Sequence, residues 1–120
     1  MKRILIVEDD GWLAENYLRI LQKDGYKVAV ANNALSAIDA VDDFKPDAIV
    51  LDVVLTGSTA FALLHELQSY SDTGEIPVVI CTNLAEDLAT KNLRPYGVRK
   101  VIDKTKMNPD DITVALKGIL

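Results

Sequence analysis

Carboxylates, a hydroxyl and an ammonium group follow four short apolar runs of this 120-residue sequence. Asp9 and Asp10 end the stretch ILIVEDD, Asp52 follows AIVL, Thr82 follows VVIC, and Lys104 lies shortly after KVI. Three carboxylates brought together repel one another unless a cation neutralises them. Hard oxygen ligands suit Mg²⁺, and Mn²⁺ can take its place. The set therefore predicts a divalent-metal site, provided that the fold brings these positions together.

The same groups are the parts that phosphoryl transfer requires. That reaction needs an attacking oxygen and positive groups around the phosphoryl oxygens. A carboxylate can supply the nucleophile, while a metal ion, a hydroxyl and an ammonium group can contact the phosphoryl group.

Five apolar runs alternate with segments of helical period, and this order predicts the elements that position the site. β-branched, two-sided hydrophobicity is typical of parallel strands covered on both faces. Apolar residues recur at helical spacing between the runs. We expect a single α/β domain over residues 1–120, with a five-stranded parallel sheet and helices on both faces. The predicted strands are 4–7, 27–31, 48–51, 78–81 and 100–102.

Helix boundaries follow from capping signals. Gly25 can cap the end of the first helix, and the stretch from Asn108 to Asp111 predicts the start of the last one. In open parallel sheets, ligands bind beyond the carboxyl ends of the strands. All the candidate residues fall at that edge.

Composition narrows the class of protein. With 49% hydrophobic and 26% charged residues, the chain is typical of a soluble domain. A net charge of −5 argues against nucleic acid as the main partner. Cys81 has no partner for an internal disulfide, and no apolar run is long enough to span a bilayer. We expect a cytoplasmic protein that does not insert into membranes.

The whole chain resembles a receiver domain of two-component response regulators, in length, in element order and in five residue types at strand ends. The resemblance implies a CheY-like fold with strand order 2-1-3-4-5. It implies that Asp52 is the phosphoacceptor, and that Asp9 and Asp10 bind Mg²⁺ together with Asp52. It also implies that Thr82 contacts a phosphoryl oxygen and that Lys104 forms an ion pair with the phosphoryl group.

The family resemblance also implies partners. The donor would be a sensor histidine kinase or a phosphotransfer protein, and the output would go to a partner protein or an effector domain outside this chain. The face of the fourth helix, fifth strand and fifth helix would be available for homodimerisation. The resemblance implies self-catalysed phosphorylation, but no turnover of a small-molecule substrate.

Several positions depart from the family pattern. Thr56 and Ala60 replace a usual proline and glycine after the acceptor, and Val101 replaces a usual aromatic residue. Thr105 follows the lysine where a proline joined by a cis bond is common, so that this bond is either trans or held cis by tertiary contacts. Asn83 follows Thr82 where alanine or glycine is usual, which narrows access to the acceptor.

Two alternatives follow from these departures. One is a pseudo-receiver that binds a protein partner without phosphorylation. The other is a phosphatase with an Asp nucleophile, but Val54 stands where its second Asp is expected.

In receivers, the positions two residues after the acceptor Asp and two after the active-site Thr flank the path of the attacking water. The resemblance places Val54 and Leu84 at these positions. Both are apolar and cannot orient that water, which predicts a long-lived phosphorylated state. We further expect Trp12 to pack in the first turn of its helix and His65 to be exposed.

Overall fold

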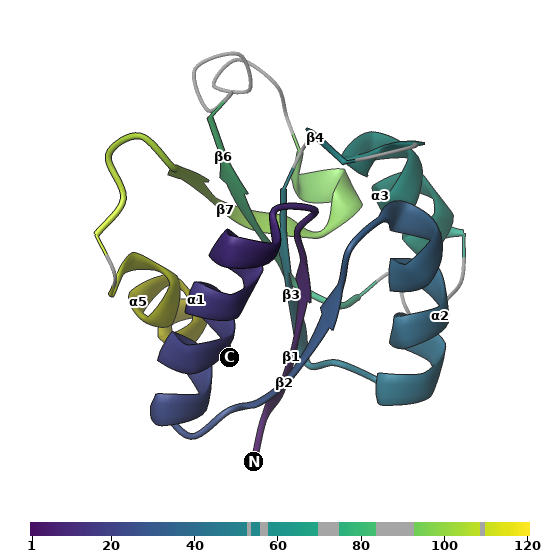
Figure 1. Ribbon diagram of the computed structural model, residues 1–120. Helices are drawn as coiled ribbons and strands as arrows, with labels where there is room; N and C mark the ends of the chain where they lie inside the picture. Colours follow the sequence, from purple (N-terminus) through teal and green to yellow (C-terminus); the bar gives the residue numbers. More distant parts are fainter. Residues whose placement is uncertain (53, 56–57, 70–74, 84–92, 109) are drawn as a thin grey trace.

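A computed structural model describes residues 1–52, 54–55, 58–69, 75–83, 93–108 and 110–120. Its main sheet consists of five parallel strands in the order β2-β1-β3-β6-β7. Because β6 and β7 are the fourth and fifth strands of this sheet along the chain, this is the predicted 2-1-3-4-5 order (Figure 1). The strands are β1 (Arg3–Val7), β2 (Lys27–Ala31), β3 (Ala48–Leu51), β6 (Val78–Thr82) and β7 (Val98–Asp103).

Helices alternate with these strands along the chain. In the described ranges they are α1 (Gly11–Lys23), α2 (Ala34–Phe44), α3 (Ala60–Gln68), the short 3₁₀ helix η1 (Arg94–Tyr96) and α5 (Asp111–Ile119). The predicted fourth helix falls outside the described residues. A small antiparallel pair, β4 (Val54–Leu55) with β5 (Ser58–Thr59), follows β3 and was not expected.

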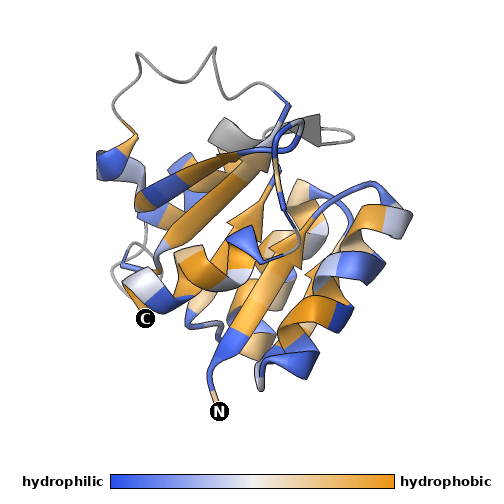
Figure 2. Cartoon of the chain, turned by 90° about the vertical axis from the view of Figure 1, so that its left-hand side faces the viewer, coloured by the Kyte–Doolittle hydropathy of each residue, from blue (hydrophilic) through white to orange (hydrophobic). Residues whose placement is uncertain are grey.

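The main sheet has a separate hydrophobic core on each face. On one face, α1 and α5 cover Ile4, Ile6 and Val50. On the other face, α2 and α3 cover Leu5 and Val7, together with residues of β3 and β6. Figure 2 shows the hydrophobic strands between helices that carry hydrophilic residues on their outer turns. The alternation along β1 explains why its apolar run is continuous: both faces are buried.

Capping residues set the ends of the helices near the predicted positions. Gly25 directly follows the C-cap of α1 with φ of 94°, a left-handed conformation that glycine adopts without strain. The start of α5 is closed by Asp111, whose side chain accepts a hydrogen bond from the Asn108 N–H at 2.8 Å. Of the helices in the described part of the chain, none is both long enough and apolar enough to cross a membrane.

Cys81 is expected to be inert towards alkylation in the folded protein. The residue is only 1% exposed in β6, and burial raises the pKa of its thiol to about 12. Because only the thiolate reacts, we expect iodoacetamide to modify Cys81 roughly 1000-fold more slowly in the folded than in the unfolded protein at pH 8. A mass-spectrometric time course measures both rates. Ser36→Cys, at an exposed position on α2, supplies a control thiol, and native Cys81 reacting as fast as this control would contradict the prediction.

Candidate functional site

Two buried carboxylates lie side by side where β1 and β3 end. The Glu8 N–H donates to the Ala31 carbonyl and the Asp52 N–H to the Val7 carbonyl, both at 3.0 Å. These bonds extend the parallel pairing by one residue beyond the apolar runs. Glu8 is 2% exposed and Asp52 is 9% exposed. The sheet itself therefore fixes the backbone of both acidic residues.

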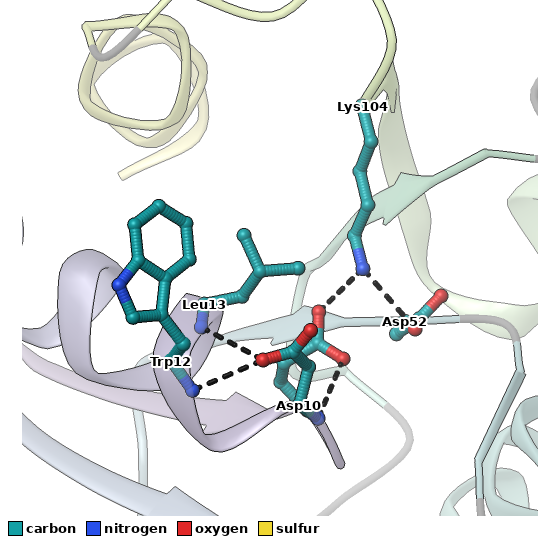
Figure 3. A network of polar contacts seen from close by, with 6 residues as sticks. Asp10, Trp12, Leu13, Asp52 and Lys104 are labelled. Atoms are coloured by element: carbon teal, nitrogen blue, oxygen red, sulfur yellow. Dashed lines mark hydrogen bonds and ion pairs between the residues drawn. The ribbon is translucent and has the colours of Figure 1, made fainter.

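Lys104 connects the two carboxylates. Its Nζ lies 2.5 Å from Glu8 Oε1 and 3.2 Å from Asp52 Oδ2. A dashed line in Figure 3 marks the contact between Lys104 and Asp52. The Lys104 side chain is only 10% exposed. The Lys104 N–H donates to the Thr82 carbonyl at 3.0 Å, so that the end of β6 anchors the lysine backbone. An ammonium group from the end of β7 thus partly neutralises acids from β1 and β3.

The acidic cluster includes Glu8, which the sequence did not single out as a ligand. Carboxylate oxygens of Glu8, Asp9 and Asp52 lie within 4.8 Å of one another. Asp10 instead caps α1: its Oδ1 accepts hydrogen bonds from the N–H groups of Trp12 at 3.0 Å and Leu13 at 3.2 Å. Figure 3 shows this carboxylate directed at the first turn of the helix. The acidic cluster therefore consists of Glu8, Asp9 and Asp52, while Asp10 lines the same cleft and caps α1. Binding of Mg²⁺ by Asp9 and Asp10 stays a prediction.

A cleft of about 370 Å³ lies over this cluster. With water occupying about 30 Å³ per molecule, this volume can hold a phosphoryl group together with several waters. Its described lining contains all five residues expected from the sequence, and adds Glu8, Leu13 and Asn83 (Glu8, Asp9, Asp10, Leu13, Asp52, Thr82, Asn83, Lys104).

The donor set fits a hard divalent cation. In an octahedral Mg²⁺ site with bonds near 2.1 Å, neighbouring ligand oxygens are roughly 3 Å apart and opposite ones roughly 4 Å apart. Three carboxylate oxygens within 4.8 Å are compatible with that spacing. Asp9 is exposed, which leaves room for the waters that Mg²⁺ retains. The acidic cluster of Glu8, Asp9 and Asp52 could therefore bind a metal ion.

Burial and charge shift the pKa values of the central pair. Burial raises the pKa of Glu8 to about 7, although the hydrogen bond and charge of Lys104 act in the opposite direction. Burial alone would lower the pKa of Lys104, but its hydrogen bond to Glu8 and the charges of Glu8 and Asp52 outweigh burial and raise it. The lysine is thus held in its charged form beside Asp52.

Two side chains outside the cluster were also predicted from the sequence. His65 is exposed, as predicted. Trp12 was expected to pack in the first turn of α1, but it is 73% exposed and does not pack there. The indole stands away from the carboxylates in Figure 3.

No cis peptide bond occurs in the part of the chain described, so the Lys104–Thr105 bond is trans. Val101 is 40% exposed on β7. Thr56 and Leu84, and the side chains of Val54 and Ala60, lie outside what the structure describes.

Fold and site together define an open parallel α/β domain with an acidic cleft at the carboxyl ends of its strands. The family model of the response regulator receiver domain matches residues 4–117. The chain belongs to this family, and is a receiver domain of the two-component response regulators. A receiver fold is typically not that of a classical enzyme.

Curated relatives agree with this assignment. The chain is 34% identical over 80 residues to the response regulator MprA of a Mycobacterium species, covering 67% of this chain and 34% of MprA. It is 28% identical over 119 residues to the phosphate regulon transcriptional regulatory protein PhoB of Escherichia coli, covering 99% of this chain and 52% of PhoB. The chain thus spans about a third to a half of these relatives.

Solved structures share the fold. The chemotaxis response regulator CheY4 of Vibrio cholerae superposes with a TM-score of 0.90 at 22% identity, covering 100% of this chain and 99% of that one. The response regulator TrrA of Thermotoga maritima, solved in complex with Mg²⁺ and BeF, gives a TM-score of 0.86 at 22% identity and full coverage of both chains.

Proposed function

We propose that residues 1–120 form a receiver domain that accepts a phosphoryl group on Asp52 in a reaction that depends on Mg²⁺. The donor is the phosphohistidine of a sensor histidine kinase or of a phosphotransfer protein. An Asp52 oxygen attacks phosphorus, the P–N bond to the histidine breaks, and an acyl phosphate forms. One observation carries this proposal: the buried Asp52 carboxylate opens into the cleft within an acidic cluster and in contact with Lys104.

Five residues of the cleft have a role in this proposal. Glu8, Asp9 and Asp52 hold the cation, which supplies positive charge to the phosphoryl oxygens when bound. Lys104 contacts Asp52 before the reaction and then pairs with the phosphoryl group, so its ammonium stays at the reacting centre. Thr82 donates its hydroxyl to a second phosphoryl oxygen. The burial of Asp52 limits the access of competing water.

The proposed output is conformational, through a partner protein or an effector domain outside residues 1–120. The cytoplasm is the proposed location, because a kinase that uses ATP supplies the phosphoryl group there. The exposed Arg99 and Lys100 of β7 support an acidic partner or a second copy on the face that β7 and α5 contribute to. The remainder of that face, the fourth helix, is outside the described residues.

A small phosphodonor tests the chemistry without a kinase. Phosphoramidate with Mg²⁺ should add one phosphoryl group to the wild-type chain, measured as intact mass, and excess chelator should prevent the addition. If no phosphoryl group is added under any Mg²⁺ concentration, the pseudo-receiver alternative takes the place of this proposal.

The stabilisation of the fold by Mg²⁺ should depend on Asp9 but not on Asp10. For a Kd on the order of 1 mM, 10 mM Mg²⁺ should raise the free energy of unfolding of the wild type by about 1.4 kcal/mol. Asp9→Asn should lose most of this gain, because it removes a carboxylate of the cluster. Asp10→Asn removes the same charge from the adjacent residue but keeps the α1 cap, since Asn is an equally good N-cap, and should retain the gain.

Denaturant unfolding with and without Mg²⁺ measures these differences, and the exposed Trp12 provides a fluorescence signal for direct titration. Equal losses in Asp9→Asn and Asp10→Asn would contradict the ligand set of Glu8, Asp9 and Asp52.

A further inference from the structure

The turn after β7 is closed by a residue outside the described lining of the cleft. Asp103 Oδ1 accepts a hydrogen bond from the Thr105 N–H at 2.9 Å and another from the Thr105 hydroxyl at 2.6 Å. The Asp103 carbonyl accepts a further bond from the Lys106 N–H at 3.1 Å. The backbone on the C-terminal side of Lys104 is therefore held by Asp103.

Lys104 is thus fixed on both sides. On its N-terminal side, its own N–H is bonded to the Thr82 carbonyl, which continues the pairing of β6 with β7. On its C-terminal side, the bonds of Thr105 to Asp103 fix the next peptide. A lysine side chain has four rotatable bonds, so its ammonium group is placed accurately only where the backbone direction is fixed first.

The turn depends on groups that this sequence supplies in place of the family proline. A proline at position 105 has no N–H to donate, whereas Thr105 donates both its N–H and its hydroxyl. The side-chain and backbone hydrogen bonds from Thr105 also hold the pKa of Asp103 below its usual range. The acceptor is therefore a charged carboxylate at neutral pH, and charge-assisted bonds of this kind are stronger than neutral ones.

We propose that Asp103 is a positioning residue for Lys104, and that its carboxylate holds the turn of residues 103–106 so that the ammonium group reaches Glu8 and Asp52. This inference rests on the proposed function, in which Lys104 contacts the phosphoryl group. Asp103 acts through Lys104, because it is not among the described residues that line the cleft.

Three single variants separate the hydrogen bonds from the charge. Asp103→Ala removes the acceptor and should slow phosphorylation by phosphoramidate about 10-fold, because the ammonium group is displaced but not removed. Asp103→Asn keeps an acceptor oxygen in the same place and should react within about 2-fold of the wild type. Asp43→Ala removes an exposed carboxylate on α2, and should likewise leave the rate within that range.

A double variant tests whether the effect passes through Lys104. Asp103→Ala with Lys104→Ala should be no slower than Lys104→Ala alone, since residues that act as one unit are not additive. An additive slowing, or a wild-type rate for Asp103→Ala, would overturn the inference. Circular dichroism of each variant at the assay temperature establishes that the compared proteins are folded.

A second readout does not depend on the reaction. In lysine-labelled protein, the two Hε protons of Lys104 should give separate NMR signals in the wild type and in Asp103→Asn, because the ammonium group is fixed. In Asp103→Ala they should merge. If the wild type is never phosphorylated, the proposed function fails while these signals still decide the role of Asp103. Separate signals in Asp103→Ala would reject that role whatever the reaction does.

Discussion

Asp52→Asn is expected to lose phosphorylation completely. An amide oxygen is a poor nucleophile and cannot form an acyl phosphate, and the substitution also removes one of the three carboxylates of the cluster. Intact mass after incubation with phosphoramidate and Mg²⁺ measures the loss. The side chain keeps its size, so the buried position at the end of β3 should remain filled.

The matched control for this experiment is Asp47→Asn. Asp47 lies just before β3 and accepts a hydrogen bond from the Arg3 N–H at 2.8 Å, at the opposite end of the strand from Asp52. An amide oxygen can accept the same bond, so this variant should be phosphorylated like the wild type. A phosphoryl group that persists in Asp52→Asn would show that another side chain is the acceptor.

The second large effect concerns the lifetime of the phosphorylated protein. Hydrolysis of an acyl phosphate needs a water held in line with the bond that breaks, and a polar side chain can hold it. Val54 and Leu84 occupy the positions two residues after Asp52 and two after Thr82, and both are apolar. Replacing them together, Val54→Asn with Leu84→Gln, should shorten the lifetime by up to about 100-fold.

The loss of the phosphoryl group is measured by intact mass after removal of the donor, at fixed Mg²⁺ concentration and temperature. Val54→Ala with Leu84→Ala is the control, because it removes bulk without adding a group that orients water. The prediction fails if the wild type loses its phosphoryl group as fast as the polar double variant. If the alanine control loses its phosphoryl group as fast as the polar double variant, the shorter lifetime comes from the access of water alone and not from its orientation.

Hydrophobic pattern predicted the strands that are buried on both faces. The predicted bounds of β2 and β3 coincide with those observed. β7 begins at Val98, two residues before its predicted start, because the exposed Arg99 of this edge strand separates Val98 from the predicted run. The β4–β5 pair was missed because two-residue strands are too short to show a period.

In the site, the sequence predicted that Asp52, Thr82 and Lys104 meet at one edge of the sheet, and the structure places all three in the cleft together with Asp9 and Asp10. Glu8 was not predicted as part of the site, although its carboxylate lies beside those of Asp9 and Asp52. Helix capping contains a signal for it: a carboxylate two residues before Trp12 is well placed to cap α1, which engages Asp10 and leaves Glu8 and Asp9 for the cluster. The contact of Lys104 with Glu8 depends on tertiary structure, since the two residues are 96 positions apart.

The position of the acyl phosphate is the most direct test of this account. Borohydride reduces an acyl phosphate to an alcohol and leaves free carboxylates unchanged, so peptide mass spectrometry after phosphorylation and reduction identifies the acceptor. We expect the reduced residue at position 52, and only in samples that contained a divalent cation. Reduction at Asp9 or at any other carboxylate, or at position 52 to the same extent in excess chelator, would contradict a metal-dependent phosphoacceptor at the end of β3.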